Sequence, residues 1–322
     1  MSSPRIQIVM GTPFGTPESG ARISDVAECQ KYANVALHHG VKALDTAAAY
    51  FKGTSEMYVG KLDLNDAVVD TKASPGTPKA HSVENLRGAA LKSIDAIAPH
   101  KINVYYLHAP DRSVPFEETC EGINKLYKDG LIKEFGLSNF PAWEVAEVYH
   151  ICKANGWILP TVYQGRYNAI QREVETELFP CLRKLGIRFY AFSPLAGGLL
   201  TGHILSVDDF DKRTGTRWDP KVTPYAGFLR GGATPLLPII KELAENLSKH
   251  DLSITEAATR WLQHHSMLDP EKSDKVVVGA TSAQQLEANL KLNALGPLPE
   301  EVVKLINAAA DKTKGLNTHY AW

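Results

Sequence analysis

The feature that most constrains the fold is an alternation of short apolar runs with longer amphipathic segments along the 322 residues. The short runs are rich in Val, Ile, Tyr and Phe, which pleated strands favour. They read IQIVMG, VKALDTA, AVVDTKA, INVYYLHA, IKEFGLSN, TVYQG, IRFYAFSP and KVVVGAT. The amphipathic segments carry apolar residues at helical spacing and cover residues 25–39, 82–97, 117–128, 142–154, 173–185 and 284–292. Strands that alternate with helices predict a parallel sheet.

Two architectures fit such a sheet, a closed (β/α)8 TIM barrel and an open doubly wound sheet. No G-x-G-x-x-G fingerprint follows the first strand, so the barrel is favoured. A loop rich in Gly, Asp, Thr and Pro follows the seventh strand, from 197 to about 234, and a tail with a helix-like piece at 300–311 ends the chain. Because no linker or low-complexity segment interrupts the pattern, we expect one domain over 1–322.

Composition excludes several classes of function. The net charge is −1, so neither nucleic acid nor a membrane surface is an expected partner. No apolar run approaches the ~20 residues of a membrane span, and no signal peptide is visible, which favours a cytoplasmic location. The four cysteines form no C-x-x-C pair, and the adjacent His264 and His265 would face apart on a helix. We therefore expect buried free thiols and no metal.

Polar residues recur where the predicted strands end. Asp45, Lys72 and His108 end the second, third and fourth strands. The next three strands end at Ser138 and Asn139, at Gln164 and at Ser193. Charged and amide groups on apolar strands are costly unless they are paired, and barrel enzymes place their active sites at the carboxyl ends of the strands. Each residue alone would more often be structural, but their recurrence at one face favours a functional site.

These groups permit reduction of a carbonyl. Asp45 and Lys72 can form a buried ion pair, and a lysine beside Tyr50 would lower the tyrosine pKa from about 10. Tyr50 could then donate a proton to a carbonyl oxygen that His108 orients. No side chain in the set can supply a hydride, so a nicotinamide cofactor is implied.

The sequence resembles the aldo-keto reductases over nearly its whole length. The runs LDTAAAY (44–50), VVDTKA, YYLHAPD, GLSNF, TVYQ and FSPLAGG match motifs of that superfamily in order. Residues 155–183 and 193–202 are most similar to its aflatoxin-aldehyde and succinic-semialdehyde reductase branch. The resemblance implies a catalytic tetrad with Tyr50 as proton donor, Asp45 and Lys72 as the pair that tunes it, and His108 as the residue that orients the substrate.

The resemblance also implies a cofactor site. Ser138, Asn139 and Gln164 would hold the nicotinamide carboxamide, and Phe192 would stack on the ring. The remaining implied contacts are Gly11, Thr12, Ser193, Leu195, Gly197, Gly198, Gly279, Thr281, Ser282, Gln285 and Asn289. Many relatives carry a basic residue within the stretch that reads GATSAQQ here, to bind a 2′-phosphate. Arg213 or Arg217 in the long loop could supply that charge, so NADPH is favoured over NADH.

The predicted substrate pocket departs from the branch. Tyr225 aligns with a tyrosine that relatives follow with an arginine, but Ala226 and Gly227 come next, and the sequence ends in Trp322 where relatives carry an arginine. We expect Trp218, Tyr225 and Trp322 to line a more apolar pocket together with Tyr50 and His108. An aromatic or bulky aldehyde or ketone then fits better than succinic semialdehyde.

The hypothesis is therefore NADPH-dependent reduction of a small carbonyl compound. Two alternatives stay open: a cofactor-binding regulatory module with little turnover, and a dehydrogenase in a biosynthetic pathway. The resemblance suggests homodimers, although no residue pattern requires one.

Overall fold

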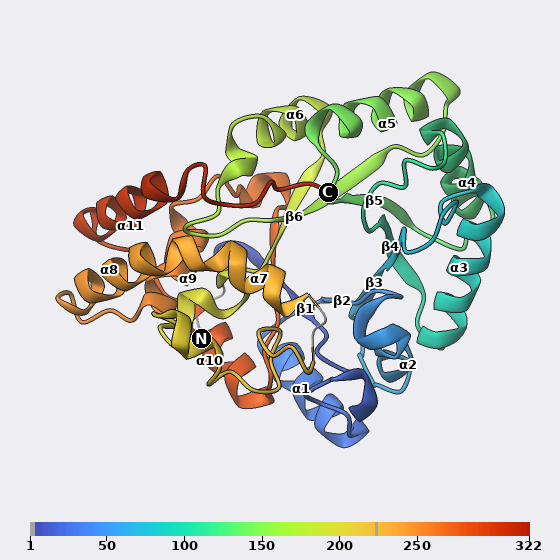
Figure 1. Ribbon diagram of the computed structural model, residues 1–322. Helices are drawn as coiled ribbons and strands as arrows, with labels where there is room; N and C mark the ends of the chain where they lie inside the picture. The colour runs from blue at the N-terminus through green and yellow to red at the C-terminus, as the bar shows by residue number, and fades with distance from the viewer. Residues whose placement is uncertain (1–3, 223–224) are drawn as a thin grey trace.

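The computed structural model describes residues 4–222 and 225–322, in which eight parallel strands close into a barrel (Figure 1). Each strand pairs with the next, and β8 pairs with β1. The strands are β1 (Gln7–Gly11), β2 (Ala43–Asp45), β3 (Val68–Ala73), β4 (Ile102–Leu107), β5 (Glu134–Ser138), β6 (Pro160–Arg166), β7 (Arg188–Phe192) and β8 (Lys275–Val278). The predicted (β/α)8 TIM barrel is confirmed.

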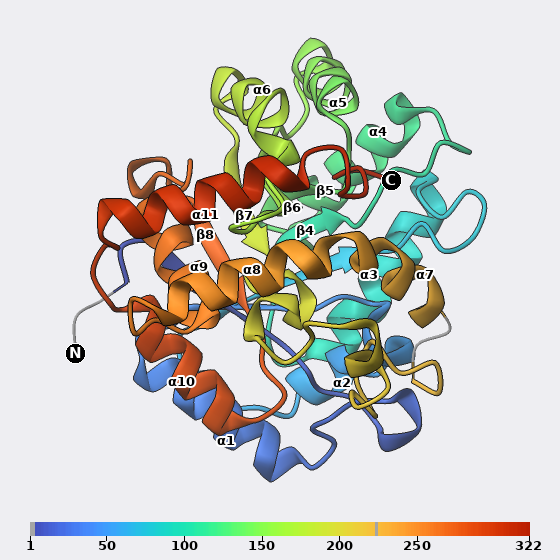
Figure 2. The ribbon, with the colours of Figure 1, turned by 60° about the vertical axis from the view of Figure 1, so that its left-hand side comes forward.

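Helices surround the barrel. They are α1 (Val26–His38), α2 (Ser55–Val59), α3 (Val83–Ile97), α4 (Phe116–Lys128), α5 (Ala142–Asn155), α6 (Leu178–Leu185), α7 (Ala226–Ala233), α8 (Leu237–Ser248), α9 (Ile254–His264), α10 (Ala283–Asn293) and α11 (Glu300–Thr313). Several begin at a side-chain cap: Asp25, Ser82, Ser253 and Ser282 each accept a hydrogen bond from a main-chain N–H of the first turn. Figure 2 shows α8 and α11 side by side, which agrees with their direct packing.

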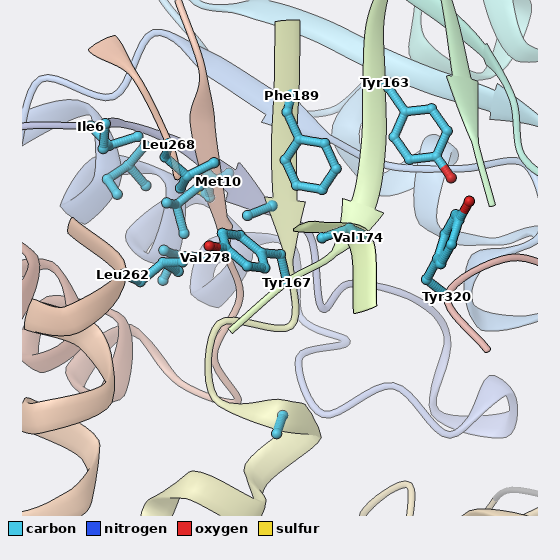
Figure 3. Packing of buried hydrophobic residues seen from close by; sticks show 14 of the residues in the cluster. Ile6, Met10, Tyr163, Tyr167, Val174, Phe189, Leu262, Leu268, Val278 and Tyr320 are labelled. Atoms are coloured by element: carbon cyan, nitrogen blue, oxygen red, sulfur yellow. The ribbon is translucent and has the colours of Figure 1, made fainter. Parts of the chain in front are cut away.

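The barrel separates two apolar clusters. The larger one lies between strands and helices; Phe189 stacks on Tyr163 at 5.8 Å and meets Tyr167 edge-on at 6.0 Å (Figure 3). The smaller one fills the barrel interior, from Val9, Ala43, Val104, Tyr106, Val162, Tyr190 and Val277. Successive residues of a strand point to opposite faces, so side chains two residues further along face the same interior at the carboxyl ends. Asp45 and Gln164 stand in those positions.

Two expectations about helices are wrong. The segment predicted as one helix over 173–185 is a short 3-10 helix (Glu173–Glu175) followed by α6. Pro180 explains the break, because proline lacks the N–H that would bond to residue 176 and its ring crowds that carbonyl. The predicted loop over 197–234 contains α7, whose glycines make it a poor helix in isolation. Arg230 anchors α7 to the preceding loop by donating to the main-chain oxygen of Trp218 at 2.8 Å.

The last residues run back across the barrel beside β5 and β6 (Figure 1). Arg166 donates to the main-chain oxygens of Thr318 and His319 at 2.6 and 3.2 Å. Tyr320 is buried, and its hydroxyl accepts from the main-chain N–H of Ala142 at 3.0 Å. The tail is therefore part of the packed structure. Within the residues that the structure describes, no helix combines the length and apolar character of a membrane span.

Candidate active site

An ion pair lies at the centre of the carboxyl end of the barrel. Lys72 Nζ donates to both carboxylate oxygens of Asp45 at 2.7 and 2.6 Å, and to the main-chain oxygen of Thr46 at 2.8 Å. Both side chains are almost fully buried. Burial alone would lower the pKa of Lys72, but the negative charge of Asp45 and the hydrogen bonds to Asp45 and Tyr50 outweigh it and leave that pKa raised. Lys72 is therefore a permanent cation at the site.

Tyr50 lies above this pair. Its hydroxyl accepts from Lys72 Nζ at 3.3 Å. Burial raises the pKa of Tyr50, while the positive charge of Lys72 opposes that rise. Lys72 lowers the pKa as expected, but the net direction is upward, so the expectation of a pKa below 10 is wrong. Removal of the hydroxyl from water outweighs the neighbouring charge, and the phenol stays protonated at neutral pH.

His108 follows β4, and its ring meets Tyr50 edge-on at 5.8 Å between centroids. Burial lowers the pKa of His108 to about 3, and the charge of Lys72 contributes in the same direction. The imidazole is therefore neutral near pH 7. A neutral ring can donate a hydrogen bond to a carbonyl oxygen without offering a competing charged acid.

The amide side chains predicted beside the tetrad are bonded to it. Gln164 Nε2 donates to Asp45 Oδ1 at 2.6 Å. Asn139 Nδ2 donates to the main-chain oxygen of His108 at 2.8 Å and to Ser138 Oγ at 3.0 Å. Thr12, after β1, donates from its main-chain N–H and its hydroxyl to the main-chain oxygen of Asp45 at 3.1 and 3.0 Å. These bonds join the ends of β1 and β6 to Asp45 and the end of β5 to His108.

The segment after β7 differs in conformation. Ser193, Gly197 and Gly198 have φ of 55°, 67° and 102°, the left-handed region where glycine is unstrained. A Cβ on Gly197 would lie 3.0 Å from Nη1 of Arg217. The Arg217 guanidinium is therefore folded over the glycine turn, and it is close enough to Tyr50 to oppose the rise of the tyrosine pKa. Phe192 and Leu195 flank this turn, half-buried.

Arg213 belongs to the same segment. Its Nε is buried and has no hydrogen-bond partner among the residues that the structure describes. A buried guanidinium nitrogen without an acceptor is unusual, because leaving such a group unpaired is costly. Arg217 thus presents hydrogen-bond donors beside the glycine turn, and Arg213 has a buried donor elsewhere in the same segment.

The predicted adenosine contacts gather at the start of α10, beside Gly279 and Gly11 at the ends of β8 and β1. Ser282 caps the helix by accepting from the Gln285 N–H at 3.2 Å, and Thr281 donates to Gln285 Oε1 at 3.0 and 2.8 Å. Asn289 lies one turn further on and is buried. A helix start with a free positive end suits an anionic ligand group.

The predicted substrate residues are not equivalent. Trp322 stacks on His108 with ring centroids 6.4 Å apart and planes 28° apart. Trp218 is buried and packs against Phe210 at 5.1 Å, inside the folded loop. Tyr225, at the start of α7, is 69% exposed. The structure therefore brings Trp322 alone of these three into ring contact with the tetrad.

The residues that anchor the C-terminal segment were not predicted from the sequence. Arg112, four residues past His108, binds both the Glu144 carboxylate and the main-chain oxygen of Trp322. Glu144 on α5 is fully buried and lies in phase with Val148 and Cys152 on the buried stripe of that helix. A charged residue in an apolar stripe is a signal that could have been noticed.

The side chains at the carboxyl end of the barrel have the chemistry that an oxidoreductase on a (β/α)8 scaffold would use. The model of the aldo/keto reductase family matches residues 7–311. An aldo-keto reductase of Pseudocercospora fijiensis is 42% identical over 84% of this chain and 93% of its own. Aflatoxin B1 aldehyde reductase member 2 of Rattus norvegicus is 40% identical over 93% and 84%, and member 4 of Homo sapiens is 40% identical over 92% and 93%.

The chain therefore belongs to the aldo-keto reductase family and is homologous to its aflatoxin aldehyde reductases. Membership implies NAD(P)H-dependent reduction of a small carbonyl substrate.

Proposed function

We propose that this protein reduces an aldehyde or ketone to the alcohol with NADPH, and that Tyr50 is the proton donor. The observation that carries the proposal is the chain of contacts from Asp45 through Lys72 Nζ to the Tyr50 hydroxyl. A lysine cation held at that hydroxyl stabilises the phenolate that remains once the proton has left.

The electrostatics suit the reducing direction. Burial keeps the Tyr50 pKa raised, so the phenol is protonated before reaction, and Lys72 offsets the cost of forming the phenolate. His108, neutral at pH 7, would donate a hydrogen bond to the same carbonyl oxygen. A bound reduced nicotinamide would supply the hydride for the carbonyl carbon.

The residues present fit that cofactor. The left-handed turn at Gly197 and Gly198 lets main chain approach a ligand, and Arg213 and Arg217 offer donors for its phosphates. The α10 start, with Gly279, Thr281, Ser282, Gln285 and Asn289, would take the adenosine end. Gly11, Thr12, Ser138, Asn139, Gln164, Phe192, Ser193 and Leu195 would surround the nicotinamide and the pyrophosphate.

Gln164 and Asn139 would serve two purposes at once. Each already donates to a tetrad residue, to the Asp45 carboxylate and to the main-chain oxygen of His108 respectively. A side-chain amide also has an acceptor oxygen, which is what the NH₂ of a carboxamide needs. These two residues would thus fix the nicotinamide relative to the tetrad.

The names of the relatives support an aldehyde substrate. A dehydrogenase in a biosynthetic pathway uses the same geometry in reverse, and no contact in the site favours that direction. A single domain, a cytoplasmic location and a homodimer stay predictions of the sequence.

The test is NADPH oxidation at 340 nm with a panel of aldehydes, NADH in parallel. Tyr50→Phe removes only the hydroxyl, so turnover should fall by about 10²–10⁴-fold while NADPH binding is retained. Turnover that survives in Tyr50→Phe would show that another group donates the proton. Tight NADPH binding without turnover on any carbonyl would favour the regulatory module.

A further inference from the structure

The tail over 317–322 is fastened to the rim of the barrel at several points. Arg166 binds the main-chain oxygens of Thr318 and His319, and the Tyr320 hydroxyl donates to Glu177 Oε1 at 2.5 Å. Figure 3 shows the Tyr320 ring beside Tyr163 of β6. The main-chain N–H of Trp322 donates to the main-chain oxygen of Asn139 at 3.0 Å. The tail therefore reaches the site in a defined position.

Its final side chain lies at the mouth of the site. The Trp322 indole is nearly parallel to the His108 ring, yet it is 69% exposed. Packed tryptophan is normally buried, so a large exposed indole fixed against a predicted catalytic ring has a free face for a ligand. Flat aromatic groups stack favourably on such a face.

Arg112 completes this arrangement. Its Nε and Nη2 donate to the two Glu144 carboxylate oxygens at 2.6 and 3.1 Å, and Nη2 also donates to the Trp322 main-chain oxygen at 2.7 Å. Glu144 is fully buried, so removing its partner would be costly and the geometry is rigid. Arg112 therefore uses its Nε and Nη2 groups to join Trp322 to α5.

We infer that Arg112, held by Glu144, is a positioning residue that sets Trp322 as one wall of the carbonyl pocket, and that the pocket selects flat aromatic carbonyl compounds. The inference rests on the proposed reductase function. Arg112 acts through the tail and touches no reacting atom. The indole contributes an apolar stacking surface in place of a charge, so a short aliphatic aldehyde gains little from it.

The test is the ratio of kcat/KM for 2-naphthaldehyde to kcat/KM for propanal. Trp322→Ala should lower this ratio about tenfold, mainly through a higher KM for 2-naphthaldehyde, and Trp322→Phe should restore most of it. Arg112→Met should lower the ratio about threefold. The double variant should match Trp322→Ala alone, because Arg112 acts only through Trp322.

Arg87→Met is the matched control, since Arg87 forms an ion pair with Asp129 at a similar exposure, 50% against 52% for Arg112. It should leave the ratio unchanged, and thermal melting should show all variants folded. An unchanged ratio in folded Trp322→Ala would overturn the inference. So would effects of Arg112→Met and Trp322→Ala that multiply, because Arg112 would then act by another route.

Failure of the proposed function is distinguishable. A protein that turns over no carbonyl refutes the reductase proposal itself. In that case, calorimetric binding of 2-naphthalenemethanol to the NADP-saturated protein still tests the role of the Trp322 indole. Trp322→Ala should weaken the affinity for this alcohol about tenfold, and equal affinity of the two proteins would reject the inference. Turnover of carbonyls with no aromatic preference refutes the inference alone.

Discussion

The tetrad end of the barrel and the segment after β7 are built in opposite ways. At the tetrad, Asp45 and Lys72 already satisfy each other, and Gln164 adds a further bond to the carboxylate. After β7, two glycines adopt left-handed conformations, Arg213 has an unpartnered buried nitrogen among the described residues, and Arg217 is exposed over the turn.

The difference fits the proposal that the segment after β7 binds the cofactor phosphates. Charges that must be oriented during the chemical step are preorganised by the protein, which costs nothing at the moment of reaction. Groups proposed to bind phosphate keep their hydrogen-bond donors available. If protein acceptors already occupied those donors, the bonds would have to break before a phosphate could bind, and binding would be weaker.

The substitution with the largest expected effect is Lys72→Met, at the tetrad end of the barrel. It leaves the Asp45 carboxylate buried without its cation, so the free energy of unfolding should fall by about 3–5 kcal/mol. Turnover should fall by about 10²–10⁴-fold, because the Tyr50 phenolate loses its counterion. Chemical denaturation and the 340 nm assay measure the two effects.

The matched control combines Lys72→Met with Asp45→Asn. Removing both charges should recover most of the stability but none of the activity, because no unpaired charge then stays buried. Equal stability of the single and double variants would mean that the loss of charge pairing between Asp45 and Lys72 does not cause the destabilisation.

Asp70 shows how burial affects a carboxylate that has no ion pair of the Asp45–Lys72 kind among the described residues. It faces the barrel interior two residues before Lys72, and among the described residues its carboxylate accepts from the Asn103 amide and the Val104 N–H. Burial raises its pKa to about 7. The folded pKa lies above the unfolded value of about 4, so the native state is penalised as pH rises from about 4 to 7.

Asp70→Asn keeps an acceptor for both donors and cannot ionise. It should leave stability nearly unchanged at pH 4 and raise the free energy of unfolding by on the order of 2–4 kcal/mol at pH 8. Denaturation across that pH range measures it. The same gain at pH 4 and pH 8 would contradict the assigned ionisation.

The smallest expected effect concerns the segment after β7. Arg217→Met should weaken cofactor binding about tenfold through loss of charge-assisted hydrogen bonds. Fluorescence titration with NADPH and NADH distinguishes the sites: equal losses indicate the shared pyrophosphate, and a loss confined to NADPH indicates the 2′-phosphate. Lys212→Met, an exposed residue paired with Asp209, is the control. Unchanged affinity for both cofactors would remove Arg217 from the site.

The strand ends were predictable because period-two alternation and barrel closure together dictate which residues meet. Asp45, Lys72 and His108 needed only the correct strand boundaries. The direction of the Tyr50 pKa was not predictable, since it depends on how much water the folded loop removes. Local sequence shows the neighbouring charge but not the burial.

The contacts that anchor residues 317–322, and the helix α7, escaped prediction for a different reason. Their positions depend on contacts far apart in the sequence, such as Arg112 with Trp322 and Arg230 with Trp218. Neither segment has a periodic pattern strong enough to stand alone. Glycines in α7 argue against a helix locally, and tertiary anchoring outweighs that preference.

The Asp45–Lys72 pair has a further chemical consequence. A primary amine beside an aldehyde can attack its carbonyl carbon and form an imine, but only the neutral amine has the lone pair to do so. With its pKa raised and its ammonium protons bound to Asp45 and Thr46, Lys72 is held in the unreactive form. The same bonds that orient the lysine protect it from being modified by an aldehyde substrate.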